Sequence, residues 1–226
     1  MESNEWSPVE AVTYGFEKVK ADPAGLILPI FAVAVAQGVP NGVFGAVASA
    51  LEQNDAPGIG AGVRFVSMIV GVLITAFLTG GMLSFLLKVV RGEEYALGDV
   101  FSGGRFFVPM LIVSIVTGFA SGVGMMLCVV PGIIVALGLQ FSSLLVVDRG
   151  LDPIEAVKES WRITEGHKMN LFIYALIGIG VVIAGFMVCC IGVIGSQTIL
   201  AVGTVFIYDR IAGGGVANAP PGPTTF

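Results

Sequence analysis

Four long stretches without a charged residue constrain this chain more than any other feature of its sequence. Residues 24–51, 65–87, 106–147 and 169–208 contain no Asp, Glu, Lys, Arg or His. A transmembrane helix needs roughly 20 consecutive apolar residues to cross a hydrocarbon core about 30 Å thick. Each of the first two stretches is long enough for one crossing, so the sequence predicts an integral membrane protein.

The third and fourth stretches are too long for a single crossing. As one helix, residues 106–147 would be about 60 Å long at a rise of about 1.5 Å per residue, which no bilayer accommodates. Each stretch is therefore predicted to form a hairpin of two spans. The turns are expected at Pro131-Gly132 and between Gly192 and Gly195, because Pro and Gly end a helix at little cost where water is near.

The predicted fold class is an all-α membrane protein with six transmembrane helices in three hairpins. The predicted spans are residues 24–50, 64–88, 106–129, 132–148, 170–189 and 193–209. Glycine supplies 32 of the 226 residues, and small residues let helices in a membrane approach closely. Residues 1–211 are expected to form one membrane domain. Residues 212–226, rich in Gly and Pro, are expected to form a disordered tail.

The distribution of positive charge predicts the orientation. With six spans, both ends of the chain share a side with the connections between spans two and three and between spans four and five. Of the 11 Lys and Arg residues, only Arg64 falls on the opposite side. The others are Lys18, Lys20, Lys88, Arg91, Arg105, Arg149, Lys158, Arg162, Lys168 and Arg210. Positive residues mark the cytoplasmic side, so both ends are predicted to be cytoplasmic.

A short segment near the start of the chain recurs before the fifth span. Pro8–Val12 has the sequence PVEAV, and Pro153–Val157 has the sequence PIEAV. In both copies a Ser or Asp precedes the Pro, and Glu10 or Glu155 follows at the spacing of a capping box. Both segments are therefore predicted to begin a helix.

Each of these helices has an apolar face. The residues on these faces are Val9, Val12, Phe16 and Val19 in the first copy, and Ile154, Val157 and Trp161 in the second. Such helices tend to lie in the membrane interface, so both are predicted to be cytoplasmic elbows that lead into a span. A shorter elbow is predicted at Tyr95–Phe101, before the third span.

Together, the elbows and hairpins predict three units of similar construction. They cover residues of about 7–90, 92–148 and 152–209. Repeats of this kind in transporters enclose an interface where substrates bind. Equally, a duplication can simply build a stable bundle, and the sequence leaves both interpretations open.

The connection before the fifth span also resembles a known family. Asp148–Val157, followed by Ser160-Trp161, Thr164 and Gly166, resembles a large bacterial group of six-span membrane proteins. The group includes the YciC-like proteins and the membrane domain of some glycerophosphoryl diester phosphodiesterases. Segments similar to that group also lie at Gly98–Phe101 and Pro131-Gly132. The resemblance implies a six-helix fold in the bacterial cytoplasmic (inner) membrane. It implies no phosphodiesterase activity, because no such domain accompanies the spans.

The spans carry no chemistry that would indicate catalysis. Ionisable groups inside a membrane are costly and usually functional, and these spans have none. Intramembrane hydrolases need a nucleophile with a base or a metal. The only histidine, His167, is predicted at the cytoplasmic edge. The sequence therefore predicts no catalytic residue, no metal site and no cofactor, and its net charge of −5 argues against a nucleic-acid partner.

A few polar residues and cysteines lie within or near the spans. The polar residues Gln37, Gln140, Ser142 and Gln197 could line a small polar cavity or could form hydrogen bonds between helices. Cys128 could form a disulfide with Cys189 or Cys190 at the outer turns if that side is oxidising. Otherwise these cysteines act as small apolar side chains.

The favoured function is a structural or interaction component of the membrane that contacts lipids, a membrane-protein partner or a second copy of the chain. The elbow residues Glu10, Phe16, Glu155 and Trp161 are its candidate contact sites. The alternative is a transporter or permease for a neutral or lipid-like substrate that passes through the repeat interface. An enzyme ranks third, since it would require Asp148, Asp152, Glu155 and His167 to converge.

Overall fold

The computed structural model describes residues 6–53, 57–188 and 190–213, and the regular structure in these residues is helical with no strand. Six of the helical segments are long and apolar enough to cross a membrane, which confirms the number of such segments predicted from the sequence. The elements are α1 (Pro8–Ala21), α2 (Pro23–Gln53), α3 (Pro57–Arg91), the 3₁₀-helix η1 (Leu97–Phe106), α4 (Phe107–Leu127), α5 (Val129–Leu139), α6 (Ser142–Arg149), α7 (Pro153–Thr164), α8 (Lys168–Val188) and α9 (Cys190–Ala212). Most of the predicted tail lies outside the described residues.

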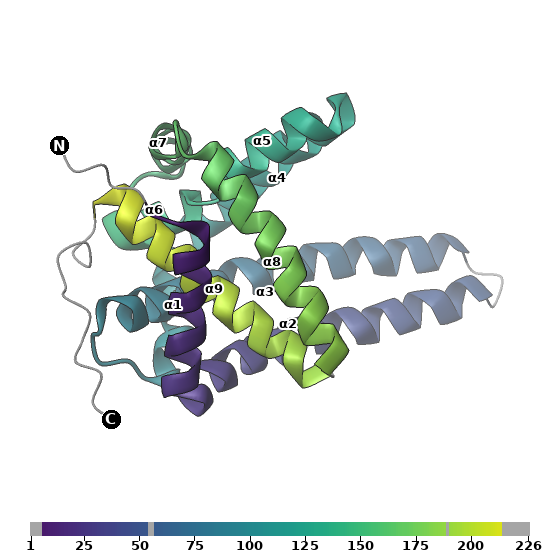
Figure 1. The fold of residues 1–226 in the computed structure, drawn as a ribbon. Coiled ribbons are helices and arrows are strands. Elements are labelled where there is room, and N and C mark those ends of the chain that lie inside the picture. Colours follow the sequence, from purple (N-terminus) through teal and green to yellow (C-terminus); the bar gives the residue numbers. More distant parts are fainter. Residues whose placement is uncertain (1–5, 54–56, 189, 214–226) are drawn as a thin grey trace.

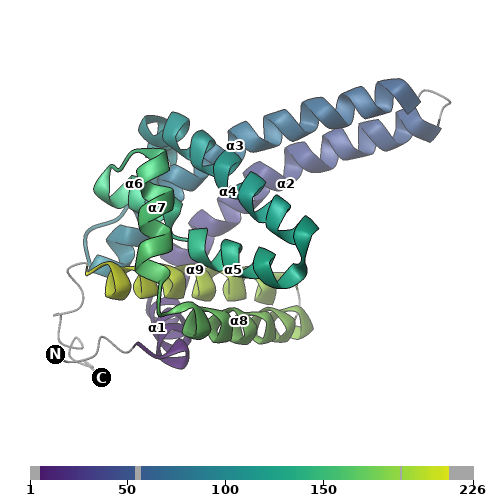
Figure 2. The ribbon, with the colours of Figure 1, turned by 90° about the horizontal axis from the view of Figure 1, so that it is seen from above.

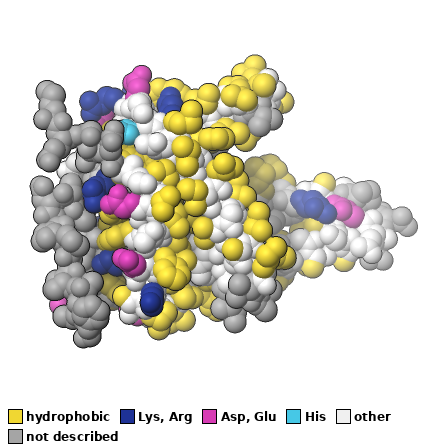
Figure 3. Space-filling model, in the orientation of Figure 1, with side chains coloured by type: hydrophobic (Ala, Val, Ile, Leu, Met, Phe, Trp, Pro, Cys, Tyr) yellow, Lys and Arg dark blue, Asp and Glu magenta, His cyan; other side chains and the backbone are white. Residues whose placement is uncertain are grey.

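The long helices pack in consecutive pairs, α2 with α3, α4 with α5, and α8 with α9. The short helices α1, α6 and α7 lie toward one end of this bundle (Figures 1 and 2). Charged side chains gather at the same end, while the adjoining surface is largely hydrophobic (Figure 3). We call this the charged end and define it by Arg91, Asp148 and Asp209, the residues of a buried ion cluster.

The pair α2 and α3 is longer than predicted. The two helices have 31 and 35 residues, so they are roughly 45 and 50 Å long and exceed a hydrocarbon core of about 30 Å. Their far ends project beyond the other helices (Figures 1 and 2). Arg64 was predicted to begin the second span, but it lies within α3 and pairs with Glu52 of α2 at 2.8 Å. This exposed ion pair lets both helices continue past their apolar residues.

The fourth span is not the continuous helix that was predicted. It is interrupted at Gln140 and Phe141, which form a turn between α5 and α6. At the break, the Ser160 hydroxyl of α7 donates to the Gly138 carbonyl at 2.8 Å and accepts the Phe141 N–H at 3.2 Å. A break at membrane depth is tolerated only where such partners satisfy the freed backbone groups. Helix α7 is therefore part of the construction of this span.

Helix α1 packs closely against α9 through small residues. Its buried residues are Ala11, Gly15 and Val19. A Cβ atom added at Gly15 would lie 2.3 Å from the Ile199 carbonyl oxygen, and one at Gly203 would lie 2.9 Å from the Ala11 carbonyl oxygen. Glycine at both positions lets the two backbones approach, as in other tightly packed membrane helices.

This contact predicts the effect of enlarging Gly15. The substitution Gly15→Val should lower the free energy of unfolding by about 1–3 kcal/mol, the usual cost of overpacking a well-packed contact. The measurement is unfolding of the purified protein in detergent. Gly180→Val on α8 is the matched control, because a Cβ atom there meets nothing within 4 Å. Equal stability of the two variants would contradict close packing of α1 on α9.

Candidate functional site: the charged end and a polar groove

The elbow helices α1 and α7 bury equivalent positions of the recurring segment. The buried residues are Ala11, Gly15 and Val19 in α1, and Ala156, Ser160 and Thr164 in α7. The outward faces match as well. Phe16 is 55% exposed and Trp161, at the equivalent position, is 37% exposed. We define the elbow faces as Val9 and Phe16 of α1 with Ile154 and Trp161 of α7, which are all partly exposed although the Trp161 ring also packs beside Gly138 of α5.

The two helix starts differ. In α1, the Ser7 N–H donates to the Glu10 carboxylate at 3.5 Å, as the capping box predicts. In α7, the Asp152 side chain makes no capping hydrogen bond, and Glu155 is exposed. Asp152 and Pro153 therefore begin α7 as predicted, but without the capping hydrogen bonds of the first copy. At the other end of α7, Trp161 forms a cation–π contact with Lys168, whose ammonium nitrogen lies 3.6 Å from the ring centroid.

A buried ion cluster joins the ends of three spans. Arg91 at the end of α3 contacts the Asp148 carboxylate of α6 at 2.6 Å and the Asp209 carboxylate of α9 at 3.3 Å. Asp209 is 0% exposed, and a buried carboxylate is tolerated only when it is paired. The Tyr208 hydroxyl donates to Asp148 at 2.8 Å, so both aspartates are held in place. The cluster fixes α3, α6 and α9 relative to one another.

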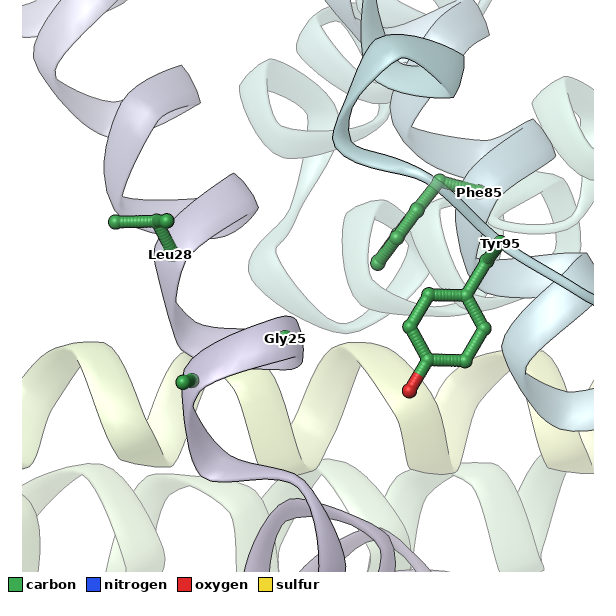
Figure 4. A pocket seen from close by; sticks show the side chains of 5 residues that line it. Gly25, Leu28, Phe85 and Tyr95 are labelled. Atoms are coloured by element: carbon green, nitrogen blue, oxygen red, sulfur yellow. The ribbon is translucent and has the colours of Figure 1, made fainter.

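A second polar contact lies where α1 joins α2. The Asp22 carboxylate accepts the Gly25 N–H at 2.9 Å and the Tyr95 hydroxyl at 2.8 Å. These two hydrogen bonds, that of Gly25 first, hold the pKa of Asp22 below its ordinary value of 3.8. Beside them is a mostly apolar pocket of about 290 Å³, lined by Gly25 and Leu28 on one side and by Phe85 and Tyr95 on the other (Figure 4).

A polar groove follows the break in the fourth span. It has a volume of about 360 Å³, and we define it by Ser114, Thr117 and Ser121 of α4 with Gln140 and Ser143 at the break. Gly118 and the apolar residues Ala136 and Leu139 complete its wall. The Gln140 amide nitrogen is buried and has no hydrogen-bond partner within the described part of the chain. Backbone discontinuities next to polar cavities are common at the binding sites of transporters.

The structure separates the polar residues that the sequence grouped together. Of Gln37, Gln140, Ser142 and Gln197, only Gln140 lines the groove. Gln37 lies near the middle of α2, where its carbonyl accepts the Asn41 amide at 2.9 Å. Ser142 is buried and donates to the Leu139 carbonyl at 2.8 Å, and Gln197 is exposed on α9.

The Cys189 residue of the predicted disulfide lies outside the described residues, while Cys128 is exposed and free within them.

The acidic residues and the histidine that the enzyme hypothesis requires to converge do not form one site. Asp148 belongs to the ion cluster, while Asp152 and Glu155 are exposed. His167 lies beside Trp6, with ring centroids 6.5 Å apart. In residues 6–53, 57–188 and 190–213, no three His, Cys, Asp or Glu side chains come close enough to hold a metal ion.

Sequence reasoning missed Arg91 and Asp209. Both flank predicted spans, where charged residues are ordinary, so neither stood out as a partner of the other. One available signal was that Asp209 directly follows a stretch without charge and is the only acidic residue near the end of the last span. Their pairing across 118 positions depends on how the spans are arranged.

Comparison with known proteins gives a family profile and distant relatives. The profile of the family described as Domain of unknown function (DUF7847) matches residues 113–219. The chain is similar to "Uncharacterized protein Rv2560" of Mycobacterium tuberculosis, with 23% identity over 99% of this chain and 77% of the relative. The same values apply to "Uncharacterized protein Mb2590" of Mycobacterium bovis. No solved structure shows significant similarity to the chain.

The ion cluster predicts a large effect for loss of its cation. Arg91→Met should lower the free energy of unfolding by about 3 kcal/mol, because the buried Asp209 loses a cationic partner. Arg64→Met is the matched control. It breaks an exposed pair on the projecting helices, so its effect on the free energy of unfolding should be much smaller than that of Arg91→Met. Unfolding of both variants in detergent checks this, and a similar loss for both would contradict a structural role for the cluster.

The Asp22 contact predicts a dependence on pH. Because the folded-state pKa is lowered, the contribution to stability is present above pH 3.8 and is lost as the pH falls through the folded-state pKa. Glu159, whose pKa is lowered by its hydrogen bond to Arg162, has the same sign. Between about pH 5 and pH 3, the wild-type melting temperature should therefore fall more steeply than that of Asp22→Asn. Parallel curves would show that the Asp22 contact is not linked to folding.

Proposed function

We propose that this chain is a multi-pass interaction protein of the bacterial cytoplasmic membrane, whose elbow helices α1 and α7 contact lipid through the elbow faces. The observation that carries the proposal is that Phe16 and Trp161 occupy equivalent outward positions at the charged end. A helix with one apolar face and charged neighbours is stable in the headgroup layer, with its apolar side chains among the acyl chains.

The orientation is part of this proposal. Lys18, Lys20, Lys158 and Arg162 lie on the elbow helices, and Arg64 alone among the cations lies on the projecting part of α3. This asymmetry supports a cytoplasmic charged end. The resemblance to the YciC-like group and the division into three elbow-plus-hairpin units belong to the same proposal, as does the absence of an enzymatic role.

Lipid is the favoured partner because of what the elbow faces carry. Lys20 and Lys158 are exposed at positions next to the apolar side chains, where they can meet anionic headgroups. A protein partner or a second copy would instead need a continuous patch, whereas the two elbow faces lie on separate helices (Figure 2). Each elbow face is small, and the two faces together could insert into the membrane interface at two separate points.

A permease for a neutral or lipid-like substrate is the second candidate function. The observation in its favour is the broken fourth span with the polar groove beside it. The groove lies within the second proposed unit, however, and not between units. The groove therefore supports a binding site on one unit more than it supports a transport path through the interface between units.

The lipid contact can be tested with tryptophan as a depth probe. Trp6 is 2% exposed, so Trp6→Phe leaves Trp161 as the reporter of α7. Adding Trp161→Phe and Phe16→Trp moves the reporter to α1. In vesicles whose lipids are brominated near the carbonyl end of the acyl chains, both reporters should be quenched, because an interfacial helix buries its apolar face about 5–10 Å deep.

The matched control moves the reporter by one residue. Glu17→Trp in the background without Trp6 and Trp161 places tryptophan at an exposed position off the apolar face. Its quenching should be weaker by at least about twofold, because tryptophan at position 17 leaves the acyl-chain layer. Equal, weak quenching at positions 16, 17 and 161 would show that the elbow faces do not enter lipid and would favour a protein partner.

A further inference from the structure

The polar groove carries an inference that does not rest on contact between the elbow faces and lipid. Its defining side chains offer hydroxyl and amide groups, and no Asp, Glu, Lys, Arg or His lines it. The Ser114, Ser121 and Ser143 hydroxyls form no hydrogen bond with other described residues, and Thr117 donates only to its own helix, to the Val113 carbonyl at 2.7 Å. The groove therefore presents unused donors and acceptors but no charge.

The Gln140 side chain gives the clearest indication of a missing partner. Gln140 lines the groove, and its amide nitrogen is buried without an acceptor among the described residues; an unsatisfied buried donor costs free energy. A serine hydroxyl can turn toward solvent or its own helix, whereas a buried amide has few alternatives. A turn of the Gln140 side chain toward the groove would let an oxygen atom bound there accept from this amide.

The depth of the groove limits what that oxygen can belong to. Ser114 and Gln140 are each nine residues from the flanking cations Arg105 and Arg149, which is roughly 13 Å at a rise of about 1.5 Å per residue. Ser121 is two helical turns deeper on α4. One leaflet of the hydrocarbon core is only about 15 Å thick, so the groove lies in the acyl-chain region. A phosphate there would be desolvated with no cation to pair with it.

The size of the groove favours a small molecule over a helix. Its 360 Å³ lies within the range of ligand pockets, about 300–1,000 Å³. A neighbouring helix, about 10–12 Å across, could only lie over the mouth and could not fill it. Ser114 and Gly118 are exposed, so the groove opens on the surface that the acyl chains would cover.

We propose that this groove binds the polar end of a neutral lipid, one that carries ester carbonyl or hydroxyl oxygens and no charged headgroup. Diacylglycerol is the simplest lipid of this class. Its oxygens accept from the Gln140 amide and exchange hydrogen bonds with the hydroxyls of Ser114, Ser121 and Ser143. Its acyl chains leave through the open side of the groove.

The test uses the full chain in phosphatidylcholine vesicles that contain a small amount of diacylglycerol with a photoreactive diazirine in one acyl chain. Irradiation should label residues within 107–149, as identified by mass spectrometry of peptides. Unlabelled diacylglycerol should compete with the probe, whereas phosphatidylglycerol at the same concentration should not.

Filling the groove should abolish this labelling. A Cβ atom at Gly118 meets nothing within 4 Å, so Gly118→Leu can enter the groove without a clash and should reduce labelling at least about tenfold. Gly180→Leu on α8 is the control, since its Cβ also meets nothing within 4 Å and it lies outside the groove. Its labelling should equal that of the wild type.

Gln140→Leu separates a binding role from a structural one. It should weaken labelling by roughly two- to tenfold, the factor expected for one neutral hydrogen bond. The melting temperature in detergent should stay the same or rise, because the orphaned donor is gone. A lower melting temperature would identify Gln140 as a structural residue and would contradict the proposal.

Three other results would overturn the proposal. One is equal labelling of Gly118→Leu and wild type, and another is equal competition by phosphatidylglycerol. The third is efficient cross-linking of two copies through Ser121→Cys in a background in which Cys128, Cys189 and Cys190 are all replaced by Ser, because a neighbouring chain would then occupy the groove. None of these results depends on whether the elbow faces enter lipid.

Discussion

The Arg91 side chain holds together three helices that have little other reason to meet at fixed positions. In a membrane, apolar helix faces gain little by packing on each other rather than on lipid. Polar contacts and close backbone approach must therefore fix the arrangement. Arg91 reaches Asp148 at 2.6 Å and the fully buried Asp209 at 3.3 Å, and so it joins α3, α6 and α9 at the charged end. Buried carboxylates without a cation would be too costly, so the helices stay together.

The break in the fourth span follows from this anchoring. The span of Val130–Arg149 has 20 residues, and its last turn is held by Asp148. The turn at Gln140 lets α6 meet the ion cluster while α5 packs on α4. The backbone groups freed at the turn are satisfied by α7, where Ser160 donates to Gly138 at 2.8 Å. The polar groove lies between this turn and α4.

The sequence predicts the parts of this fold that depend on local composition. Uncharged stretches indicated six spans, and the recurring PVEAV and PIEAV segments predicted the starts of α1 and α7. The inward faces of these helices were predicted less well. The sequence grouped Val9 and Phe16 with Val19, but the structure buries Val19 together with Ala11 and Gly15. At Gly15, the backbone of α9 comes too close for a larger residue. The break at Gln140 has no local signal, because neither Gln140 nor Phe141 is a helix breaker and the partner that stabilises it is Ser160 of another helix.

The elbow α7 connects the two features that carry the functional proposals. Adjacent residues of this helix take part in both features: Ser160 is buried at the break, and Trp161 is partly exposed on the elbow face. The Trp161 ring also lies against Gly138, where a Cβ atom would come within 2.5 Å of it. Any displacement of α7 must therefore either carry α5 with it or break the Ser160 hydrogen bonds that stabilise the turn. Since that turn positions Gln140, the geometry of the polar groove depends on where the elbow helix lies.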